Sequence, residues 1–310
     1  MAMDFKHISV LLEESIIALN IKPDGVYVDC TAGGGGHSAE VLKQLNDNGR
    51  MILIDRDPDA IATVTNRFRG DKRVTIVHSN YSEIKSVLND LGVDGVDGII
   101  ADLGVSSHQL DTPERGFSFH HEAPLDMRMS QQGTTAEEIV NTYSQKELFN
   151  VINKYGEEKF ASSVASAIVR AREKKRIKTT LELAEIVSNA IPAKFRRNGH
   201  PARKTFQAIR IEVNAELTVL ENTLPDMFEC LNKDCVLAII TFHSLEDRIV
   251  KDYFKTLKEG CTCPKDFPVC VCGKSPKAIV KSSGTKATGK EVSENNRSRS
   301  AKLRTAIKLK

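Results

Sequence analysis

The sequence predicts an α/β fold, in which an all-helical domain is inserted into a doubly wound, Rossmann-like parallel sheet. Up to residue 103, short apolar runs that read as strands alternate with stretches of helical periodicity, which is the rhythm of a parallel sheet. Between about 136 and 223 the periodicity is helical throughout, and strand character returns at 234–242. The first predicted strand also leads into a turn of four glycines, residues 33–36, as in sheets that bind nucleotides.

The individual elements follow from local patterns. Residues 8–19 carry apolar side chains at helical spacing. Asp57 followed by Pro58 reads as the entry to a helix, because proline fits the first helical position. Strands are predicted at about 26–30, 51–55, 74–78, 97–103 and 234–242, a helix at 245–254, and a final edge strand within 301–310.

The return of strand character after the helical stretch predicts a discontinuous domain. Residues 1–112 and 224–310 are expected to form the sheet domain, and residues 113–223 the inserted helical domain. Within the last part, residues 282–300 are rich in Ser, Thr, Gly and Lys, and we expect this stretch to be flexible.

The composition of the chain indicates a globular protein without a membrane span. The chain has 310 residues, of which 40% are hydrophobic, enough for more than one core. No apolar run approaches the length of a membrane span, and acidic residues interrupt the N-terminal apolar stretch. We therefore expect a cytoplasmic protein without a membrane partner. Residues 274–310 contain eight Lys, three Arg and two Glu, and so basic a tail suggests a polyanionic partner, although it is also typical of a solvated, disordered tail.

The turn and the second strand together predict a cofactor that contains adenosine. Glycine lets the backbone approach a ligand closely. Asp55 ends the second predicted strand, about twenty residues after the turn, where a carboxylate can accept hydrogen bonds from ribose hydroxyls. The alternative for the glycines alone is a tight strand-to-helix turn with no ligand.

A third acid distinguishes between cofactors. Asp102 lies near the C-terminal end of the fourth predicted strand, at the sheet edge that faces the ligand crevice. A carboxylate there suits the ammonium group of a methionine moiety and would repel a pyrophosphate, which favours S-adenosylmethionine over NAD. An NAD-dependent oxidoreductase remains the alternative, and Asp102 could instead be a helix cap or a turn acid.

Basic residues cluster inside the predicted insertion. One cluster lies within 170–178 and a second within 194–204. Together with the basic tail they favour a footprint on a phosphate backbone, although a run of charges is also typical of a solvated helix face. The clusters contain Arg170, Arg172, Lys174, Lys175, Arg176 and Lys178, and then Lys194, Arg196, Arg197, His200, Arg203 and Lys204.

Four cysteines form a C-x-C…C-x-C pattern in a turn-rich loop: Cys261, Cys263, Cys270 and Cys272. Four thiolates in a short loop suit tetrahedral structural zinc, although the usual spacing is C-x₂-C. The alternative is a cysteine-rich turn without metal, since a reducing compartment disfavours disulfides.

Long sequence blocks carry a family resemblance. They include Asp55-Arg56-Asp57-Pro58, Asp102-Leu103-Gly104-Val105-Ser106-Ser107-His108-Gln109-Leu110-Asp111, Pro124-Leu125-Asp126-Met127-Arg128-Met129 and Phe242-His243-Ser244-Leu245-Glu246-Asp247-Arg248. In these blocks, from His7 to nearly the C-terminus, the chain resembles the bacterial ribosomal RNA small-subunit methyltransferase H (MraW-like) family. It departs from the family at Asn296, where proline is usual, and many relatives lack the cysteine cluster.

The resemblance implies a function and a site. The family methylates the N4 amino group of a cytidine in small-subunit (16S) ribosomal RNA, and its small inserted helical domain is expected to recognise the substrate. The partner would be that RNA, within the small ribosomal subunit, while a homodimer is left open. The implied residues around S-adenosylmethionine are Gly35, Gly36, His37, Asp55, Tyr81, Asp102 and Gln109.

The chemistry of the reaction adds candidates for catalysis. Cytosine N4 is a poor nucleophile, so an acceptor for its protons would help it to react. Asp102 or a neighbouring backbone carbonyl is the candidate acceptor, while Phe117, Phe119 and His243 are candidates to hold the base. For these three, core packing or an ordinary polar contact is the alternative. A further alternative is an RNA-binding assembly factor that keeps the fold without catalysis.

Overall fold

The computed structural model describes residues 9–196, 199–260, 272–281 and 283–310. The chain folds into two compact units. The sheet unit consists of Met1–Gly104 and Leu217–Lys310, and the helical unit consists of Val105–Glu216. The first division lies eight residues before the predicted boundary 112/113, and the second lies seven residues before the predicted boundary 223/224. At the first, α5 (Ser107–Asp111) packs against the short helix Pro113–Arg115 that follows it.

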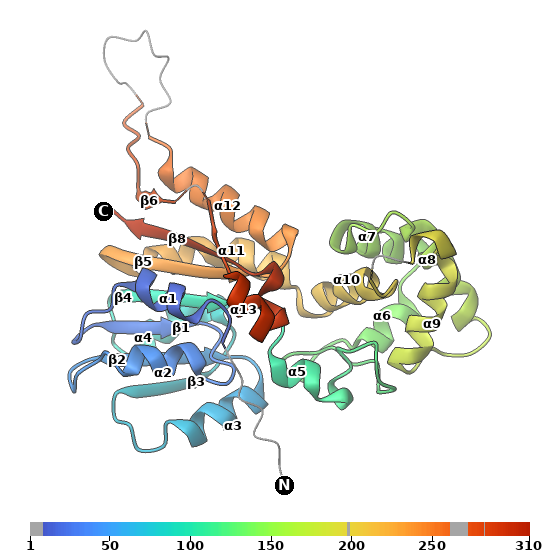
Figure 1. The fold of residues 1–310 in the computed structure, drawn as a ribbon, viewed down its shortest axis with the longest axis horizontal. Helices are drawn as coiled ribbons and strands as arrows, with labels where there is room; N and C mark the ends of the chain where they lie inside the picture. The colour runs from blue at the N-terminus through green and yellow to red at the C-terminus, as the bar shows by residue number, and fades with distance from the viewer. Residues whose placement is uncertain (1–8, 197–198, 261–271, 282) are drawn as a thin grey trace. The chain divides into compact units, whose positions relative to one another are not determined.

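The sheet unit is built on one mixed sheet with the strand order β3-β2-β1-β4-β5-β8-β6, in which β7 also pairs with β8 (Figure 1). The first five strands are parallel, in a doubly wound order. The strands are β1 (Val26–Asp29), β2 (Arg50–Asp55), β3 (Val74–His78), β4 (Val96–Asp102), β5 (Leu231–Thr241), β6 (Ala278–Val280), β7 (Thr285–Lys286) and β8 (Lys302–Lys308).

The predicted final edge strand is internal, which corrects the expectation from the sequence. β8 pairs antiparallel with β5 on one side and with β6 on the other. The prediction was wrong because β6 has three residues and β7 has two, too few to show an alternating pattern. β5 also begins at Leu231, earlier than predicted.

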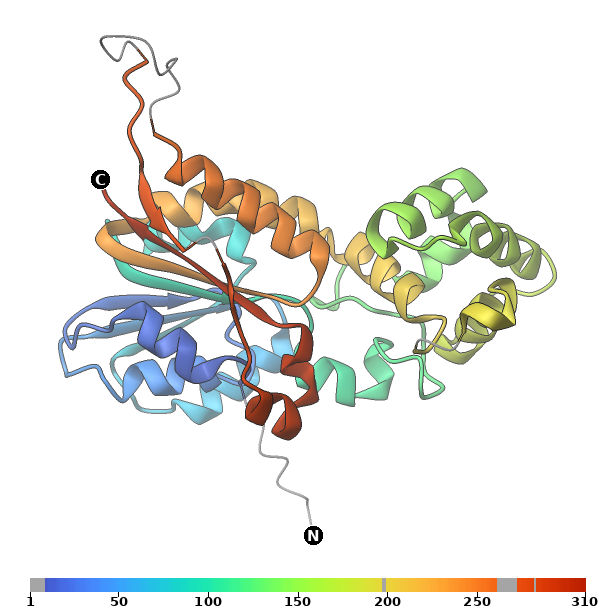
Figure 2. The ribbon, with the colours of Figure 1, turned by 45° about the horizontal axis from the view of Figure 1, so that its top comes forward.

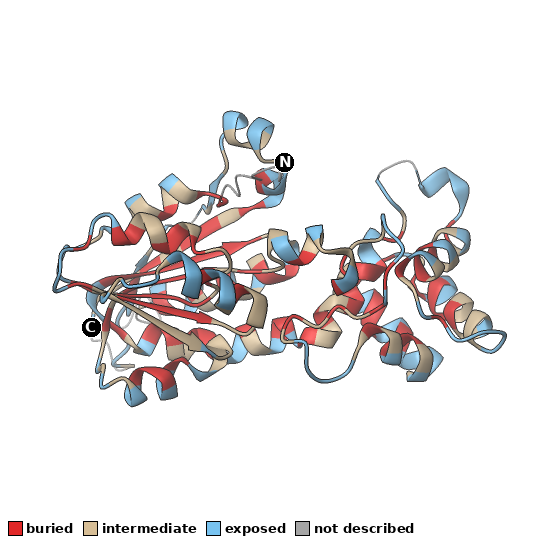
Figure 3. Ribbon diagram, turned by 90° about the horizontal axis from the view of Figure 1, so that it is seen from below, coloured by how far each residue is buried: buried red, intermediate tan, exposed pale blue. Residues whose placement is uncertain are grey.

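Alternate side chains of the strands build a core on each face of the sheet. Val28 and Ile52 belong to one core with α4 (Ile84–Asp90), α11 (Glu216–Glu229) and α12 (Ser244–Lys258). Tyr27 and Met51 belong to the other core, with α1 (Leu12–Leu19), α2 (Gly36–Leu42) and α3 (Pro58–Arg67). Side chains alternate because successive residues of a strand point to opposite faces. Figure 2 shows the helices above and below the sheet, and Figure 3 shows buried residues concentrated along the strands.

The helical unit has a core of its own. Its buried side chains come from every one of the longer helices, for example Ile139, Ile152, Ile168, Leu183 and Ile209. These helices are α6 (Ala136–Thr142), α7 (Gln145–Gly156), α8 (Ala161–Arg172), α9 (Thr180–Ala190) and α10 (Arg203–Asn214).

Capping boxes explain where several helices of this unit begin. Thr135 and Glu138 cap α6 in this way, and Ser144 caps α7 with Glu147. In each box the hydroxyl of the cap residue accepts a hydrogen bond from the backbone N–H of the third helical residue. The glutamate side chain accepts one from the backbone N–H of the cap residue. The box therefore satisfies two backbone donors at the start of the helix.

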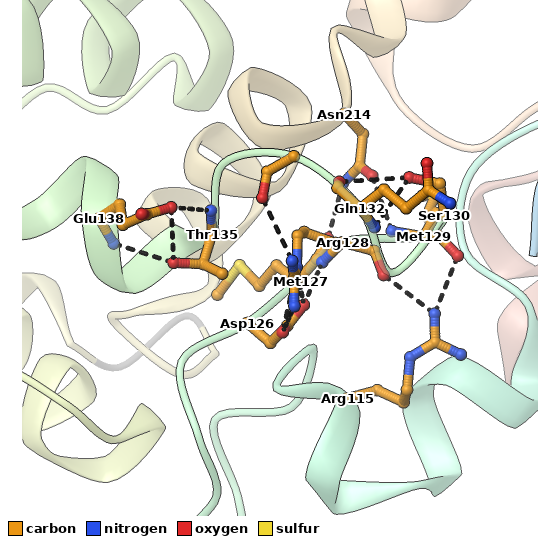
Figure 4. Close-up of polar contacts among 11 residues, drawn as sticks. Arg115, Asp126, Met127, Arg128, Met129, Ser130, Gln132, Thr135, Glu138 and Asn214 are labelled. Atoms are coloured by element: carbon orange, nitrogen blue, oxygen red, sulfur yellow. Dashed lines mark hydrogen bonds and ion pairs between the residues drawn. The ribbon is translucent and has the colours of Figure 1, made fainter.

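A polar clamp holds the segment that precedes α6 (Figure 4). Arg115 Nη2 donates to the carbonyl oxygens of Arg128 and Met129 at 2.9 and 3.0 Å. Asn214 Oδ1 accepts from Met129 N at 2.8 Å, and Asn214 Nδ2 donates to Met127 O at 2.7 Å. Met127 has a φ of 61°, which is rare for a residue with a side chain. The clamp therefore gives this block of the family resemblance a structural role.

The described part of 282–300 contains regular structure. It includes β7 and α13 (Gly289–Glu294), and Glu291 Oε1 accepts a hydrogen bond from Leu11 N at 2.7 Å. Its flexibility stays a prediction. Among the described residues, no helix is both long and apolar enough to cross a membrane.

Candidate active site

The glycine turn after β1 is bonded to the end of β2. Gly33 N donates a hydrogen bond to Asp55 Oδ2 at 2.8 Å. Gly33 and Gly35 have φ angles of 49° and 73°, which glycine adopts without steric penalty. A Cβ at Gly35 would lie 2.7 Å from the Phe68 ring. The turn therefore needs glycine here, and it leads directly into α2, which begins at Gly36.

Asp55 ends β2, and its carboxylate already accepts two backbone hydrogen bonds. Oδ2 accepts from Gly33 N and Oδ1 accepts from Asp57 N, each at 2.8 Å. Burial raises the pKa of Asp55 to about 6, although the two hydrogen bonds act in the opposite direction. A carboxylate offers about four lone-pair positions, so both oxygens keep the capacity to accept from the hydroxyls of a ribose.

Asp102 ends β4 with a carboxylate oxygen that lacks a partner. Its backbone N donates to Thr31 Oγ1 at 2.6 Å. Its Oδ1 is buried with no hydrogen-bond partner among the described residues, and its Oδ2 lies 4.0 Å from His37 Nδ1. Burial, and then the charges of Asp29 and Glu246, raise the pKa of Asp102 well above its usual value. An anionic site of this kind is suited to a positively charged group.

Asp29 also contributes negative charge to this site, which was not predicted from the sequence. It is buried at the end of β1, where Oδ2 accepts from Ser38 Oγ at 2.6 Å and Oδ1 accepts from Thr31 N at 3.1 Å. Burial raises its pKa, while these bonds lower it. Its place at the end of a strand, directly before the glycine turn, is the signal that could have identified it. Asp29 ties β1 to α2 and adds negative potential near Asp102.

Four of the predicted cofactor residues follow the carboxyl ends of four neighbouring strands. Gly35 follows β1, Asp55 ends β2, Tyr81 follows β3 and Asp102 ends β4. Tyr81 starts a short 3-10 helix, Tyr81–Glu83, and is half-buried. Because the strands are parallel and adjacent, the structure brings these residues to one edge of the sheet.

Of the three remaining cofactor candidates, Gly36 begins α2, and the other two have structural contacts. His37 is buried in the first turn of α2, with Nε2 at 3.1 Å from Val10 O, so its ring ties α2 to the segment before α1. Gln109 belongs to the helical unit, where its Oε1 accepts from Ser106 N at 3.0 Å in the capping box of α5. His37 therefore lies beside the edge of the sheet, whereas Gln109 belongs to the other unit.

Sequence comparison identifies the family. The model of the MraW methylase family matches residues 4–309. The chain belongs to the MraW methylase family. It is 55% identical over 309 residues to the ribosomal RNA small subunit methyltransferase H of Clostridium botulinum (strain Kyoto), covering 99% of this chain and 100% of that protein. It is 56% identical over 306 residues to the protein of the same name from Lachnospira eligens, with 97% of each chain covered.

Comparison with solved structures gives more distant similarities. An rRNA methylase from Streptococcus thermophilus has a TM-score of 0.40 and 10% identity, with 98% of each chain covered. NSun6 from Pyrococcus horikoshii with SFG has a TM-score of 0.45 and 13% identity, covering 98% of this chain and 53% of that one. The family predicted from the sequence is confirmed by the sequence relatives, and the oxidoreductase alternative is wrong for this chain.

The three candidates for holding the base differ in the residues that surround them. His243 is the N-cap of α12, with Nδ1 accepting from Glu246 N at 3.5 Å and Nε2 at 3.2 Å from Glu246 Oε1. Phe117 is buried in the core of the helical unit. Phe119 is half-buried and stacks on His200, with ring centroids 4.5 Å apart. Phe117 thus has the core packing that was its alternative, whereas His243 caps α12 through Nδ1 and its buried Nε2 has no hydrogen-bond partner among the described residues.

Most of the predicted zinc ligands lie outside the described residues. Cys261, Cys263 and Cys270 lie there, while Cys272 is described and half-buried. Within the described part of the chain, no group of three or more His, Cys, Asp or Glu side chains could hold a metal ion. The zinc site stays a prediction.

Proposed function

We propose that this chain transfers a methyl group from S-adenosylmethionine to the N4 amino group of a cytidine in small-subunit (16S) ribosomal RNA. The methyltransferase class follows from the family and from relatives at 55% identity. The observation that carries the chemistry is the half-buried Asp102 carboxylate at the carboxyl edge of the sheet, whose buried Oδ1 has no hydrogen-bond partner among the described residues. The target nitrogen follows from the family resemblance of the sequence.

The residues at this edge fit S-adenosylmethionine. The backbone of the turn can approach the cofactor because Gly35 has no side chain. Asp55 would accept hydrogen bonds from the ribose hydroxyls, and Asp102 would hold the ammonium group. When bound, the cofactor supplies a methyl group attached to a positively charged sulfur. Asp29 and Glu246 add negative potential that favours this cationic ligand.

Asp102 is also placed to accept a proton. When cytosine N4 gains a methyl group, the nitrogen must lose one proton to return to a neutral amine. A carboxylate with a raised pKa accepts such a proton more readily than an ordinary one. Positioning of the base and the preorganised polar site would supply most of the remaining acceleration.

The substitution Asp102→Asn separates these two roles. It removes the negative charge and keeps the size of the side chain. If Asp102 anchors the cofactor, the affinity for S-adenosylmethionine falls. If Asp102 accepts the proton, kcat for methyl transfer falls while that affinity is kept. Asp90→Asn, at an exposed position at the end of α4, is the matched control. Wild-type affinity and wild-type kcat in Asp102→Asn would contradict both roles.

We assign RNA recognition to the helical unit, and its second basic cluster supports this assignment better than its first. In the first cluster, several of the cationic side chains bind groups within the unit. Arg172 Nη1 donates to Val140 O at 2.8 Å, Lys175 pairs with Glu182 at 2.6 Å and Arg176 pairs with Glu137 at 2.7 Å. The two ion pairs offset part of the charge that a phosphate backbone would meet.

The second cluster combines exposed charge with exposed aromatic surface. Lys194, Arg203 and Lys204 are exposed. Phe195 is 53% exposed, and Lys194 Nζ lies 5.0 Å from the centre of its ring. An exposed ring beside cations can stack on an unpaired base while the cations bind phosphates.

The remaining partners belong to the same proposal. We take the RNA within the small ribosomal subunit as the substrate, so that the enzyme acts in the cytoplasm, where ribosomes assemble. Transfer of labelled methyl groups to purified small subunits and to free 16S RNA distinguishes the two forms of substrate. A homodimer stays a prediction that sedimentation would test.

A further inference from the structure

A pocket of about 380 Å³ opens where β5 ends in the sheet unit. Three segments build it: the end of β5 with the loop after it, the first two turns of α12, and the start of β8. Its lining residues are Thr241, Phe242, His243, Ser244, Asp247, Arg248, Lys251, Ser300 and Lys302.

The lining carries a surplus of positive charge. It includes three cationic side chains, Arg248, Lys251 and Lys302, and one carboxylate, Asp247. Burial raises the pKa of Asp247, but hydrogen bonds from Arg304 and Lys302 outweigh it, so the pKa is lowered and the carboxylate stays ionised. Lys302 Nζ lies 2.6 Å from Asp247 Oδ2. Because Arg304 and Lys302 both bind Asp247, the charge of this acid is already balanced.

Arg248 and Lys251 are placed together and reach solvent. Both are exposed, and they lie three residues apart on α12, which puts them on one face of the helix. The hydroxyls of Ser244 and Ser300 also line the pocket. Cationic side chains together with hydroxyl groups are the usual protein partners of a phosphate group.

The pocket adjoins the proposed reaction site. Ile240 of β5 pairs in register with Asp102 of β4, and the pocket begins at the next residue, Thr241. Neighbouring strands lie about 4.8 Å apart. Glu246, in the first turn of α12, is close enough to Asp102 to raise its pKa. The start of α12 therefore lines the pocket and also lies near Asp102.

We propose that this pocket binds a backbone phosphate of the RNA substrate close to the nucleotide that is methylated. The inference rests on the proposed function. A phosphate bound here would position the strand without reading its sequence, and the positive end of the α12 dipole adds to the attraction. The pocket would thus fix the backbone while the base reaches the carboxyl edge of the sheet.

The test compares two double variants that remove the same charge from the same helix. Arg248→Gln with Lys251→Gln changes the pocket. Lys255→Gln with Lys258→Gln changes two exposed lysines in the last turns of α12, outside the lining. Affinity for 16S RNA is measured by fluorescence anisotropy over a range of salt concentrations, with methyl-transfer kinetics and cofactor affinity measured beside it.

The pocket variant should bind RNA about tenfold more weakly, and its slope of log K against log salt should become shallower by about 0.7–0.9 for each phosphate that is no longer neutralised. Its affinity for S-adenosylmethionine and its kcat at saturating RNA should stay at wild-type values, while the control variant should resemble the wild type. An unchanged salt slope in the pocket variant, or an equal weakening in the control, would overturn the proposal. A wild-type protein that binds RNA but transfers no methyl group would instead contradict the proposed function, and the binding comparison would still test the pocket.

Discussion

Asp55 connects the two sequence features that predict a cofactor, because its carboxylate bonds the glycine turn to the end of β2. Replacing Asp55 with Ala removes an acceptor for the ribose hydroxyls and the bond to Gly33 N. We expect affinity for S-adenosylmethionine to fall by about 1.5–3 kcal/mol, roughly ten- to a hundredfold. Isothermal calorimetry measures this, and unchanged affinity would refute the assignment of Asp55.

The raised pKa of Asp55 predicts a pH dependence of cofactor binding. Ribose hydroxyls donate to the ionised carboxylate, so affinity should be nearly complete about one pH unit above the pKa and should be lost as pH falls through about 6. At pH 5 the affinity should be about tenfold weaker. Asp102, whose pKa is also raised, acts in the same direction, so titration of Asp55→Asn isolates its share. Affinity that stays constant between pH 5 and 8 would contradict the prediction.

The positions of some site residues could be predicted from the sequence, and those of others could not. Asp55 and Asp102 could be placed because each ends an apolar run, and the ends of parallel strands share one edge. The hydrogen bond between His37 and Val10 spans 27 positions, which no local pattern reveals. The hydrogen bond by which Gln109 caps its helix is local. That local bond does not show to which of the two units Gln109 belongs, because the division into units depends on the whole fold.

Among the helices and strands, the length of the element decided whether it could be predicted from the sequence. The five parallel strands and α12 have clear apolar patterns and could be predicted. The short strands β6 and β7 could not, and their absence from the prediction placed β8 at the edge of the sheet. The basic runs were visible in sequence, but the pairing of Lys175 with Glu182 depends on a helix turn and a loop meeting in the folded unit.

That pairing predicts unequal effects for the two basic clusters. Lys194→Glu with Arg203→Glu should weaken RNA binding and make its salt slope shallower by about 0.7–0.9 for each phosphate left without its cation. Lys175→Glu with Arg176→Glu should have the smaller effect on RNA affinity, because both side chains form ion pairs within the unit. Both variants should keep wild-type cofactor affinity, and filter binding over a salt series measures the difference. Equal weakening from the two clusters would contradict this ranking.

The cysteine loop is predicted to bind zinc. Cys261, Cys263, Cys270 and Cys272 lie within twelve residues and would fill all four positions of a structural zinc. Metal analysis of protein purified without chelator should find about one zinc per chain, and a chelator should increase proteolysis at 260–273 before it affects cofactor binding. Metal-free protein with four reactive thiols would show a cysteine-rich turn instead.

At the scale of the whole molecule, the inserted organisation was readable from the sequence because strand character stops and then returns. The helical unit has its own buried core, and the sheet unit is formed by two separate stretches of chain. The exact division could not be read, because α5 lies between the division and the first predicted boundary and α11 runs across the second. The basic pocket also needed the fold, since β5, α12 and β8 meet only in the sheet unit.

Nucleoside analysis tests the central claim most directly. Small ribosomal subunits from a strain that lacks the enzyme are incubated with the purified protein and labelled S-adenosylmethionine. The RNA is then digested and its nucleosides are separated by mass spectrometry. We expect the label in a single species, cytidine methylated at N4, with none from the Asp102→Asn, Asp55→Ala double variant at matched protein concentration. Label on another base, at another position of cytidine or on no RNA at all would contradict the proposed function.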